Sequence, residues 1–345
     1  MKCALKLAFA LALLIAVTAV QAQTSVSSTN QKTDLVKFSP EGLYLPQARP
    51  TAARTLNFPT DKSYGGVIIL DAPLFVFHNT AGGKGSSTCK AQGMLRVPAN
   101  KFVVFAPNAN FIMAPHSLDH LPANAFDGVV FRFMSMEDSD TGKGDPALAA
   151  LNHFTSIRSL DLEKAEISDK GLNQLKDLKN LEFITLFSTE TRGEFIKQLT
   201  GCKRLRSIKL SHDGIDMSYL QYLALYPQLC QLSLRRTMLT AQAAKPLMHC
   251  HNLQYLDISD NPQVDDGVIP VLLSLRKLQI LRMDRTAISR SGLRSLFAAG
   301  VKPEGADLLA PVSGSGPKSS VSAAAQKQRS EMETIFAPMS RGRGL

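Results

Sequence analysis

One apolar phrase recurs along this chain at nearly constant spacing, and it constrains the fold more than any other feature. Each copy carries aliphatic residues at its first, fourth and sixth positions, as Leu229, Leu232 and Leu234 do. The copies, which we number one to six, open at Ile157, Leu181, Leu205, Leu229, Leu253 and Leu278. Successive copies begin 24 residues apart, except for a last step of 25. A fixed period of this length is typical of a solenoid made of repeated strand-and-helix units.

The residues within each copy predict a short strand, a turn and a short helix. Leu232 and Leu234 alternate with the polar Ser233, so the two leucines should face the same side of a strand. The ninth position of copies two to six carries side chains that can bond to turn backbone: Thr189, Asp213, Thr237, Asn261 and Thr286. Near the twelfth position stand favourable N-cap residues: Ser168, Asp216, Thr240, Asp265 and Ser289. Apolar residues at helical spacing follow them, which predicts a helix that returns to the next strand.

The pattern Leu-x-x-Leu-x-Leu-x-x-Asn/Thr-x-Leu resembles the leucine-rich repeat family over residues 157–300. The resemblance implies an α/β solenoid in which a parallel sheet forms the concave face and short helices form the convex face. Cys202 and Cys250 occupy a core position that other copies fill with residues such as Leu178, which resembles the cysteine-containing, ribonuclease-inhibitor-like bacterial type. The two cysteines lie two copies apart, about 10 Å at strand spacing, which is too far for a disulfide. We therefore expect both thiols to be buried in the core.

The first 22 residues have the features of a secretory signal peptide. Lys2 and Lys6 precede an apolar run from Leu7 to Val20, and Ala22 supplies a small residue at the expected cleavage site. The run is too short to span a membrane with flanks, and no other stretch is long enough. The chain is therefore predicted to be exported, to a periplasm or out of the cell, without a membrane span.

Three further segments are predicted around the repeats. Residues 23–50 are rich in Ser, Thr, Gln and Pro and are predicted to form a flexible linker. Residues 51–120 contain β-rich runs separated by Gly and Pro, and we expect them to cap the N-terminal end of the solenoid. The solenoid is assigned to residues 121–300 and includes a degenerate first strand near Val129 and Phe131. Residues 301–345 are rich in Pro, Gly, Ser and Ala and are predicted to be a disordered tail.

The sequence contains no recognisable catalytic or metal-binding set. The neighbouring residues His249 and His251 rarely converge on one ion in such a loop, and a fourth ligand at recognisable spacing is absent. The Gly-rich stretch 82–87 lacks the spacing and the following helix of a phosphate loop. The formal net charge is +10, but no long Lys/Arg run suggests nucleic acid, and an acidic surface or a polysaccharide remains an alternative partner. We therefore predict a non-enzymatic protein without cofactor, metal or nucleic-acid partner.

The strand face is the expected binding surface, because a solenoid presents a long and rigid row of side chains there. Positions three, five and seven of the phrase should point outward on that face, and aromatic residues and arginines are enriched at interfaces. The candidate partner-binding residues are Phe183, Phe187, Lys209, Gln231, Arg235, Tyr255, Asp257, Ile280, Arg282 and Asp284. The predicted function is thus an exported module that binds another protein through its concave face. The alternative is a ligand- or glycan-binding site in the N-terminal β region, near Phe75, Phe77, His78 and Lys84, with the repeats as its scaffold.

Overall fold

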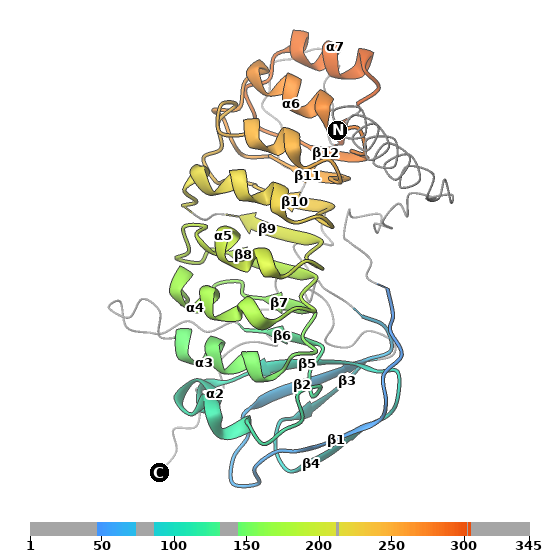
Figure 1. The fold of residues 1–345 in the computed structure, drawn as a ribbon, viewed down its shortest axis with the longest axis vertical. Helices are drawn as coiled ribbons and strands as arrows, with labels where there is room; N and C mark the ends of the chain where they lie inside the picture. The colour runs from blue at the N-terminus through green and yellow to red at the C-terminus, as the bar shows by residue number, and fades with distance from the viewer. Residues whose placement is uncertain (1–46, 74–85, 132–143, 212–213, 302, 305–345) are drawn as a thin grey trace, which may run out of the picture. The chain divides into compact units, whose positions relative to one another are not determined.

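The computed structural model describes residues 47–73, 86–131, 144–211, 214–301 and 303–304, all within one compact unit (Figure 1). The predicted signal peptide and nearly all of the predicted linker and tail lie outside these residues. The residues Phe75, Phe77, His78 and Lys84 of the alternative binding site also lie outside them. The description that follows therefore concerns the six copies and the β region that precedes them.

One sheet of 11 strands runs through the described residues, and its long parallel part contains one strand from each copy (Figure 1). Equal positions of successive copies pair with each other, so that Gln231 pairs with Ser207 on one side and Tyr255 on the other. The sequence period therefore sets the register with which the parallel strands pair in the sheet. The parallel strands are β5 (Phe102–Pro107), β6 (Gly128–Val130), β7 (Ser159–Asp161), β8 (Phe183–Phe187), β9 (Ser207–Ser211), β10 (Gln231–Ser233), β11 (Tyr255–Asp257), β12 (Ile280–Arg282) and β13 (Pro303–Glu304).

The helical segments lie on one side of this sheet (Figure 1). The α-helices are α2 (Ala109–Met113), α3 (Asp145–Ala150), α4 (Asp169–Asn173), α5 (Phe195–Gln198), α6 (Ile269–Ser274) and α7 (Arg290–Ala298). The 3-10 helices are η1 (Pro115–Leu118), η2 (Leu151–His153), η3 (Gln174–Asp177), η4 (Leu199–Gly201), η5 (Met217–Leu225), η6 (Lys245–His249) and η7 (Asp266–Val268). All five predicted N-cap side chains accept a hydrogen bond from a backbone N–H of the turn that follows them: Ser168, Asp216, Thr240, Asp265 and Ser289.

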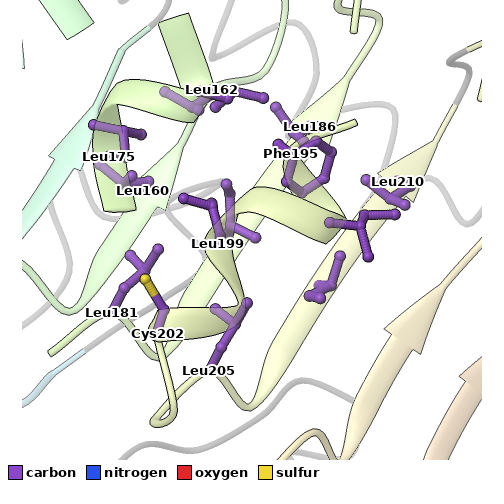
Figure 2. Close-up of a cluster of buried hydrophobic side chains, with 14 of the residues drawn as sticks. Leu160, Leu162, Leu175, Leu181, Leu186, Phe195, Leu199, Cys202, Leu205 and Leu210 are labelled. Carbon is purple, nitrogen blue, oxygen red and sulfur yellow. The ribbon is translucent and has the colours of Figure 1, made fainter. Parts of the chain in front are cut away.

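The apolar residues of the phrase fill the space between the sheet and the helical segments (Figure 2). Leu160 and Leu186 from strands and Leu199 from a helical segment are fully buried there. Cys202 and Cys250 are buried in the same core, as predicted, and both are free thiols. Burial raises the pKa of the Cys202 thiol to about 11 and that of Cys250 to about 12. Both cysteines therefore serve as small apolar core residues.

Side-chain hydrogen bonds of Asn261 join the turns of copies four and five. Its amide oxygen accepts hydrogen bonds from the backbone N–H groups of Thr237 and Leu239 in copy four, at 3.1 and 3.0 Å. Its amide nitrogen donates to the carbonyl oxygens of Leu234 and Ile258, at 2.8 and 2.9 Å. Asn261 is fully buried, so this residue satisfies turn backbone that water cannot reach. The interpretation of the ninth position is confirmed at this residue.

The N-terminal β region continues the same sheet. Its strand β2 (Gly65–Leu70) pairs antiparallel with β5 on one side and with β3 (Ser86–Lys90) on the other. The strands β1 (Arg54–Asn57) and β4 (Met94–Val97) form a separate antiparallel pair. Because β5 also pairs in parallel with β6, the ladder passes from this region to the copies without a break.

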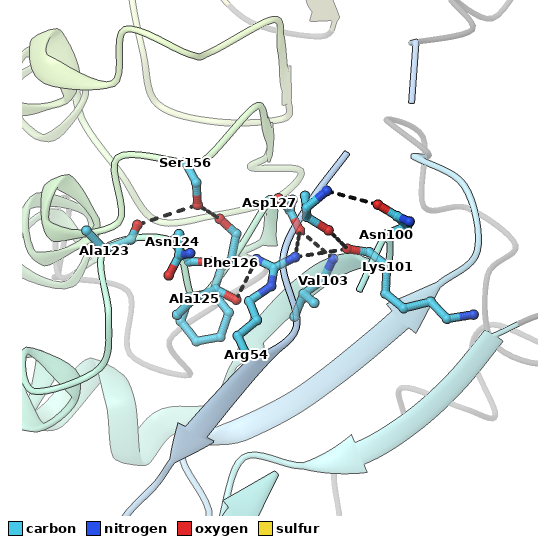
Figure 3. Close-up of polar contacts among 11 residues, drawn as sticks. Arg54, Asn100, Lys101, Val103, Ala123, Asn124, Ala125, Phe126, Asp127 and Ser156 are labelled. Carbon is cyan, nitrogen blue, oxygen red and sulfur yellow. Dashed lines mark hydrogen bonds and ion pairs between the residues drawn. The ribbon is translucent and has the colours of Figure 1, made fainter. Parts of the chain in front are cut away.

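A shared core and a buried ion pair join this β region to the segment that directly precedes copy one. The Phe126 ring stacks on the ring of Phe105 in β5, with 4.7 Å between their centroids. The centroids of the Phe126 and Phe154 rings, the latter just before copy one, are also 4.7 Å apart. The guanidinium of Arg54 on β1 contacts the Asp127 carboxylate at 2.6 Å, and both side chains are buried (Figure 3). The same carboxylate accepts a hydrogen bond from the Val103 backbone N–H at 2.8 Å. The apolar end of copy one is therefore covered by this region.

Candidate functional site

The outer face, which we define as the sheet face opposite the helical segments, carries positions three and five of each strand. The prediction that all of them are exposed is wrong for four candidate residues, which are buried: Phe183, Gln231, Tyr255 and Asp257. Parallel strands lie about 4.8 Å apart, less than the length of such side chains, so a residue of the next copy covers part of each one. Gln231, for example, accepts a hydrogen bond from the Ser207 hydroxyl at 2.8 Å. Ile280, at the same position in copy six, is half-buried.

Cations lie over two of these buried aromatic rings. The Lys209 ammonium is 5.7 Å from the ring centroid of Phe183, and the Arg282 guanidinium is 5.6 Å from that of Tyr255. Such cation–π contacts stabilise both partners, and they explain why the aromatic rings are not the outermost layer. Sequence reasoning treated the cations and the rings as equal members of an exposed patch, whereas the cations form its surface.

Lys209 lies near the middle of the outer face and is half-buried. Desolvation lowers the pKa of its ammonium group to about 8, although the carboxylates of Asp161 and Asp257 act in the opposite direction. Phe187, two strand positions further along β8, is also half-buried. The central part of the face therefore offers little freely exposed surface at the candidate positions.

The candidate residues of copies four and six are more accessible. Arg235 and Asp284, both at position seven, are exposed, and Arg282 is half-buried. The Arg235 guanidinium donates to the carboxylate of Asp260 at 2.6 Å, and Arg285 forms an ion pair with the same carboxylate. Partial burial acts to raise the pKa of Asp260, but the hydrogen bonds from Arg285 and Arg235 outweigh it and lower that pKa.

These side chains surround a hollow of about 320 Å³, which we call the arginine hollow. It is lined by Arg235, Asp257, Ser259, Arg282, Asp284, Arg285 and Glu304. Arg282 contacts Glu304 of β13 at 3.4 Å. Three arginines and three carboxylates thus share one concave surface, and four of its seven lining residues were candidates from the sequence.

Arg285 and Asp260 were missed because they occupy position eight of the phrase, just beyond the alternation of the strand. Position eight has a positive φ wherever the structure describes it: Lys164, Ser188, Arg236, Asp260 and Arg285. The left-handed backbone ends the alternation of the strand at this position, and the Asp260 carboxylate there contacts both Arg235 and Arg285. The sequence could have pointed to these two residues, because position eight is repeatedly polar. It directly precedes the ninth position, whose side chain bonds to turn backbone.

A second hollow, of about 170 Å³, lies at the other end of the sheet. Residues at the end of the predicted linker, including Arg49, line it together with Lys101, Asp127 and Arg158. Arg158 and Glu182 form a buried ion pair at 3.0 Å, and Arg49 contacts the same carboxylate. Ion pairs therefore engage all the charged residues that line this hollow: Arg49, Asp71, Lys101, Asp127 and Arg158.

The described part of the chain contains neither a membrane-spanning helix nor a metal-binding cluster. None of its helices has the length and apolarity that a bilayer crossing requires. No three histidine, cysteine, aspartate or glutamate side chains within that part gather closely enough to hold a metal ion. The rings of His249 and His251 lie 6.4 Å apart at 84° to each other.

Comparison with known protein families identifies repeats in two stretches of the chain. The family model for the leucine rich repeat matches residues 153–175 and 249–269, and no curated protein matches the chain. Among solved structures, the chain is similar to internalin C2 from Listeria monocytogenes, with 25% identity, a TM-score of 0.36, and coverage of 54% of this chain and 70% of that chain. It is also similar to an LRR protein from Leptospira interrogans, with 13% identity, a TM-score of 0.35, and coverage of 55% and 56%. A third similar structure is TLR13 in complex with ssRNA13, with 20% identity, a TM-score of 0.35, and coverage of 54% of this chain and 29% of that chain.

Three observations now coincide: the family match, a ladder whose register equals the sequence period, and short helical segments on one side of the sheet. The six copies form an α/β leucine-rich repeat solenoid.

Proposed function

We propose that this protein is an exported, non-enzymatic binding protein that holds another protein at the arginine hollow of its outer face. The observation that carries the proposal is the concentration of accessible charged side chains there, at copies four to six. Arginine is enriched among the residues that dominate binding energy at protein interfaces. Leucine-rich repeat solenoids present a rigid strand face on which such residues can be arranged.

The charge balance of the hollow favours a protein partner over a polyanion. Arg235, Arg282 and Arg285 are matched by three lining carboxylates, so the hollow has no net positive charge. A nucleic acid or an acidic polysaccharide needs an uncompensated row of cations, because phosphate and sulfate groups are all negative. A protein surface can place opposite charges against both signs, and such complementarity gives specificity.

Internal ion pairs also prepare these side chains for binding. Asp260 holds Arg235 and Arg285, and Glu304 contacts Arg282. Long side chains lose rotamer freedom when they are immobilised at an interface, and part of that loss has already occurred in the free protein. The arginine hollow is therefore a preorganised surface.

A cross-linked pull-down with the purified protein, followed by affinity measurement with the captured partner, tests this proposal. We expect the double substitution Arg235→Gln and Arg285→Gln to weaken binding by about tenfold or more, since each arginine of a hot spot contributes more than 1 kcal/mol. The matched control is Lys170→Gln with Lys176→Gln, two exposed lysines of copy one. Equal affinity of the parent and the arginine variant would contradict the proposal.

A separate measurement on the natively produced protein tests export. The positively charged start, apolar run and small residues of the first 22 positions support cleavage after Ala22. Mass spectrometry of the natively produced protein should find a chain that begins at Gln23. A chain that retains Met1 to Ala22 in the soluble cell fraction would contradict export.

A further inference from the structure

A row of large apolar side chains is exposed on the helical side of the solenoid. Leu225 at the end of η5 is 50% exposed, Met248 of η6 is 40%, Leu273 of α6 is 40% and Phe297 of α7 is 41%. Each stands one or two residues before the position that Tyr226, Cys250, Leu275 and Ala299 occupy in their copies. The first three of these residues are buried in the core, whereas Ala299 is exposed. We call these four exposed side chains the helical ridge.

The four side chains form one surface because their helical segments are neighbours. Segment η5 packs against η6, η6 against α6, and α6 against α7. In copies one and two the same two positions hold Lys176 and Asp177, and Thr200 and Gly201. The helical ridge is therefore restricted to copies three to six.

Stability of the solenoid does not explain the ridge. The core-facing members of the same segments are separate leucines, all buried: Leu223, Leu247, Leu272 and Leu296. The ridge residues point to solvent on the side that these leucines leave open. A contiguous exposed apolar surface rimmed by polar residues is typical of an interaction site.

The charged rim of the ridge is mainly basic. Five exposed cations lie on its segments or directly after them: Lys245, Arg276, Lys277, Arg290 and Arg294. Lys245 precedes Met248 by three residues in a 3-10 helix, where such positions are in line. Arg294 precedes Phe297 by three residues in α7, so the two share a helix face.

The acidic groups near the ridge are engaged in helix capping. Asp266 accepts hydrogen bonds from the backbone N–H and the hydroxyl of Ser289, and Asp265 accepts one from the backbone N–H of Gly267. These bonds hold the carboxylates at the turn that begins each helix. Asp216 caps η5 in the same way. Because the five cations outnumber these three carboxylates, the surface around the ridge combines apolar side chains with an excess of positive charge.

We propose that the helical ridge docks the protein on an anionic lipid bilayer. Apolar side chains of this kind enter the boundary between headgroups and acyl chains, while lysine and arginine meet the lipid phosphates. A second copy of the chain fits the ridge poorly, because a twofold interface would bring the five cations of one copy against those of the other. The anionic bilayer satisfies both the apolar and the basic part of the surface.

Vesicle co-sedimentation with the full chain, purified as its host processes it, tests the proposal. One vesicle population contains equal parts of phosphatidylglycerol and phosphatidylcholine, and the other contains phosphatidylcholine alone. We expect binding to the anionic vesicles to be at least about tenfold stronger, and to weaken as salt increases.

Two triple variants separate the apolar and basic contributions. Met248→Ser, Leu273→Ser and Phe297→Ser remove apolar groups, whereas Arg276→Gln, Lys277→Gln and Arg294→Gln remove charge. Each set should weaken binding by about tenfold or more, because a stable membrane contact needs both contributions. The control Lys170→Gln, Lys176→Gln and Lys179→Gln removes three exposed cations from copy one and should leave binding unchanged.

Three results would overturn the proposal: equal binding to both vesicle types, unchanged binding of either triple variant, or a dimer in light scattering that the apolar set dissociates without any vesicle binding. All substituted residues are exposed, and circular dichroism checks that each variant is folded. The Arg235→Gln and Arg285→Gln variant should bind vesicles as the parent does. Failure of this proposal is therefore distinguishable from failure of the arginine hollow.

Discussion

At the scale of single residues, position eight of the phrase adopts a backbone conformation that ordinary side chains avoid. Its described members have φ values from +52° to +59°, which costs about 1 kcal/mol or more for each non-glycine residue. Their backbone N–H groups provide a compensating interaction with the next copy, as Arg236 donates to the Ser259 carbonyl at 3.0 Å and Asp260 to the Asp284 carbonyl at 2.8 Å. The strained residue therefore extends the ladder beyond the strand, and it brings Arg285 to the arginine hollow.

A pH-dependent prediction concerns Lys209. Burial lowers the pKa of its ammonium group from 10.5 to about 8. Between these pH values the unfolded chain binds more protons than the folded chain, so the contribution of Lys209 to the free energy of unfolding increases with pH. At pH 7 the folded protein carries a charge that its surroundings disfavour. We expect Lys209→Met to be more stable than the parent at about pH 7, and its advantage to shrink from about pH 8 to pH 10.

Urea unfolding of the parent and the variant across this pH range measures the difference. The matched control is Lys176→Met, because Lys176 is exposed. Its stability relative to the parent should not change with pH in this range. A constant advantage of Lys209→Met from neutral to alkaline pH would contradict the lowered pKa.

At the scale of elements, turns as well as strands connect neighbouring copies. Each turn has carbonyl and N–H groups that the strand ladder does not pair, and the core covers them. Asn261 bonds to backbone of both copy four and copy five, so a single side chain holds two units in register. The ninth position therefore contributes to the contacts between copies.

Asn261→Ala should lower the free energy of unfolding by roughly 3 kcal/mol or more, because several buried backbone groups lose their partners at once. The control is Thr286→Ala in copy six, where one hydroxyl donates to the Met283 carbonyl at 2.9 Å. That substitution should cost about 1 kcal/mol. Denaturant titration of both variants measures the two values, and similar small losses would contradict the role assigned to Asn261.

At the scale of the whole described unit, one continuous core and one sheet join the N-terminal β region to the six copies. Repeats of this kind gain stability mainly from their neighbours, so a covered end matters for the entire array. Phe126 contacts Phe105 of the β region and Phe154 near copy one, and it is fully buried. A substitution at Phe126 therefore tests how strongly the stability of the β region and that of the six copies depend on each other.

Phe126→Ala should lower the free energy of unfolding by about 3–5 kcal/mol, as expected for removal of a large buried ring. We also expect a single unfolding transition at a lower temperature, seen equally by far-UV and near-UV circular dichroism. Phe297→Ala, on the exposed helical ridge, is the matched control and should change stability by less than about 0.5 kcal/mol. Two separate transitions in the Phe126 variant would show that the β region and the copies unfold independently.

Much of the solenoid could be predicted because each local signal repeats with the same period. Leu232 and Leu256 are 24 residues apart and pair directly, so the spacing in the sequence is also the spacing in the ladder. The caps at Ser168 and Ser289 act within a few residues of their own positions, and so does the bond from the Asn261 amide to the Ile258 carbonyl. Interactions of such short range are encoded locally and can be read from the chain.

Exposure on the outer face could not be read in this way, because it depends on side chains that stand one or more copies away. Alternation alone placed Phe183 and Tyr255 at the surface, whereas the cations of Lys209 and Arg282 lie over them. The sequence by itself determined the repeat, its register and its buried leucines. Only the tertiary structure decided which outward residues reach solvent, since strands about 4.8 Å apart bring longer side chains from neighbouring copies over one another.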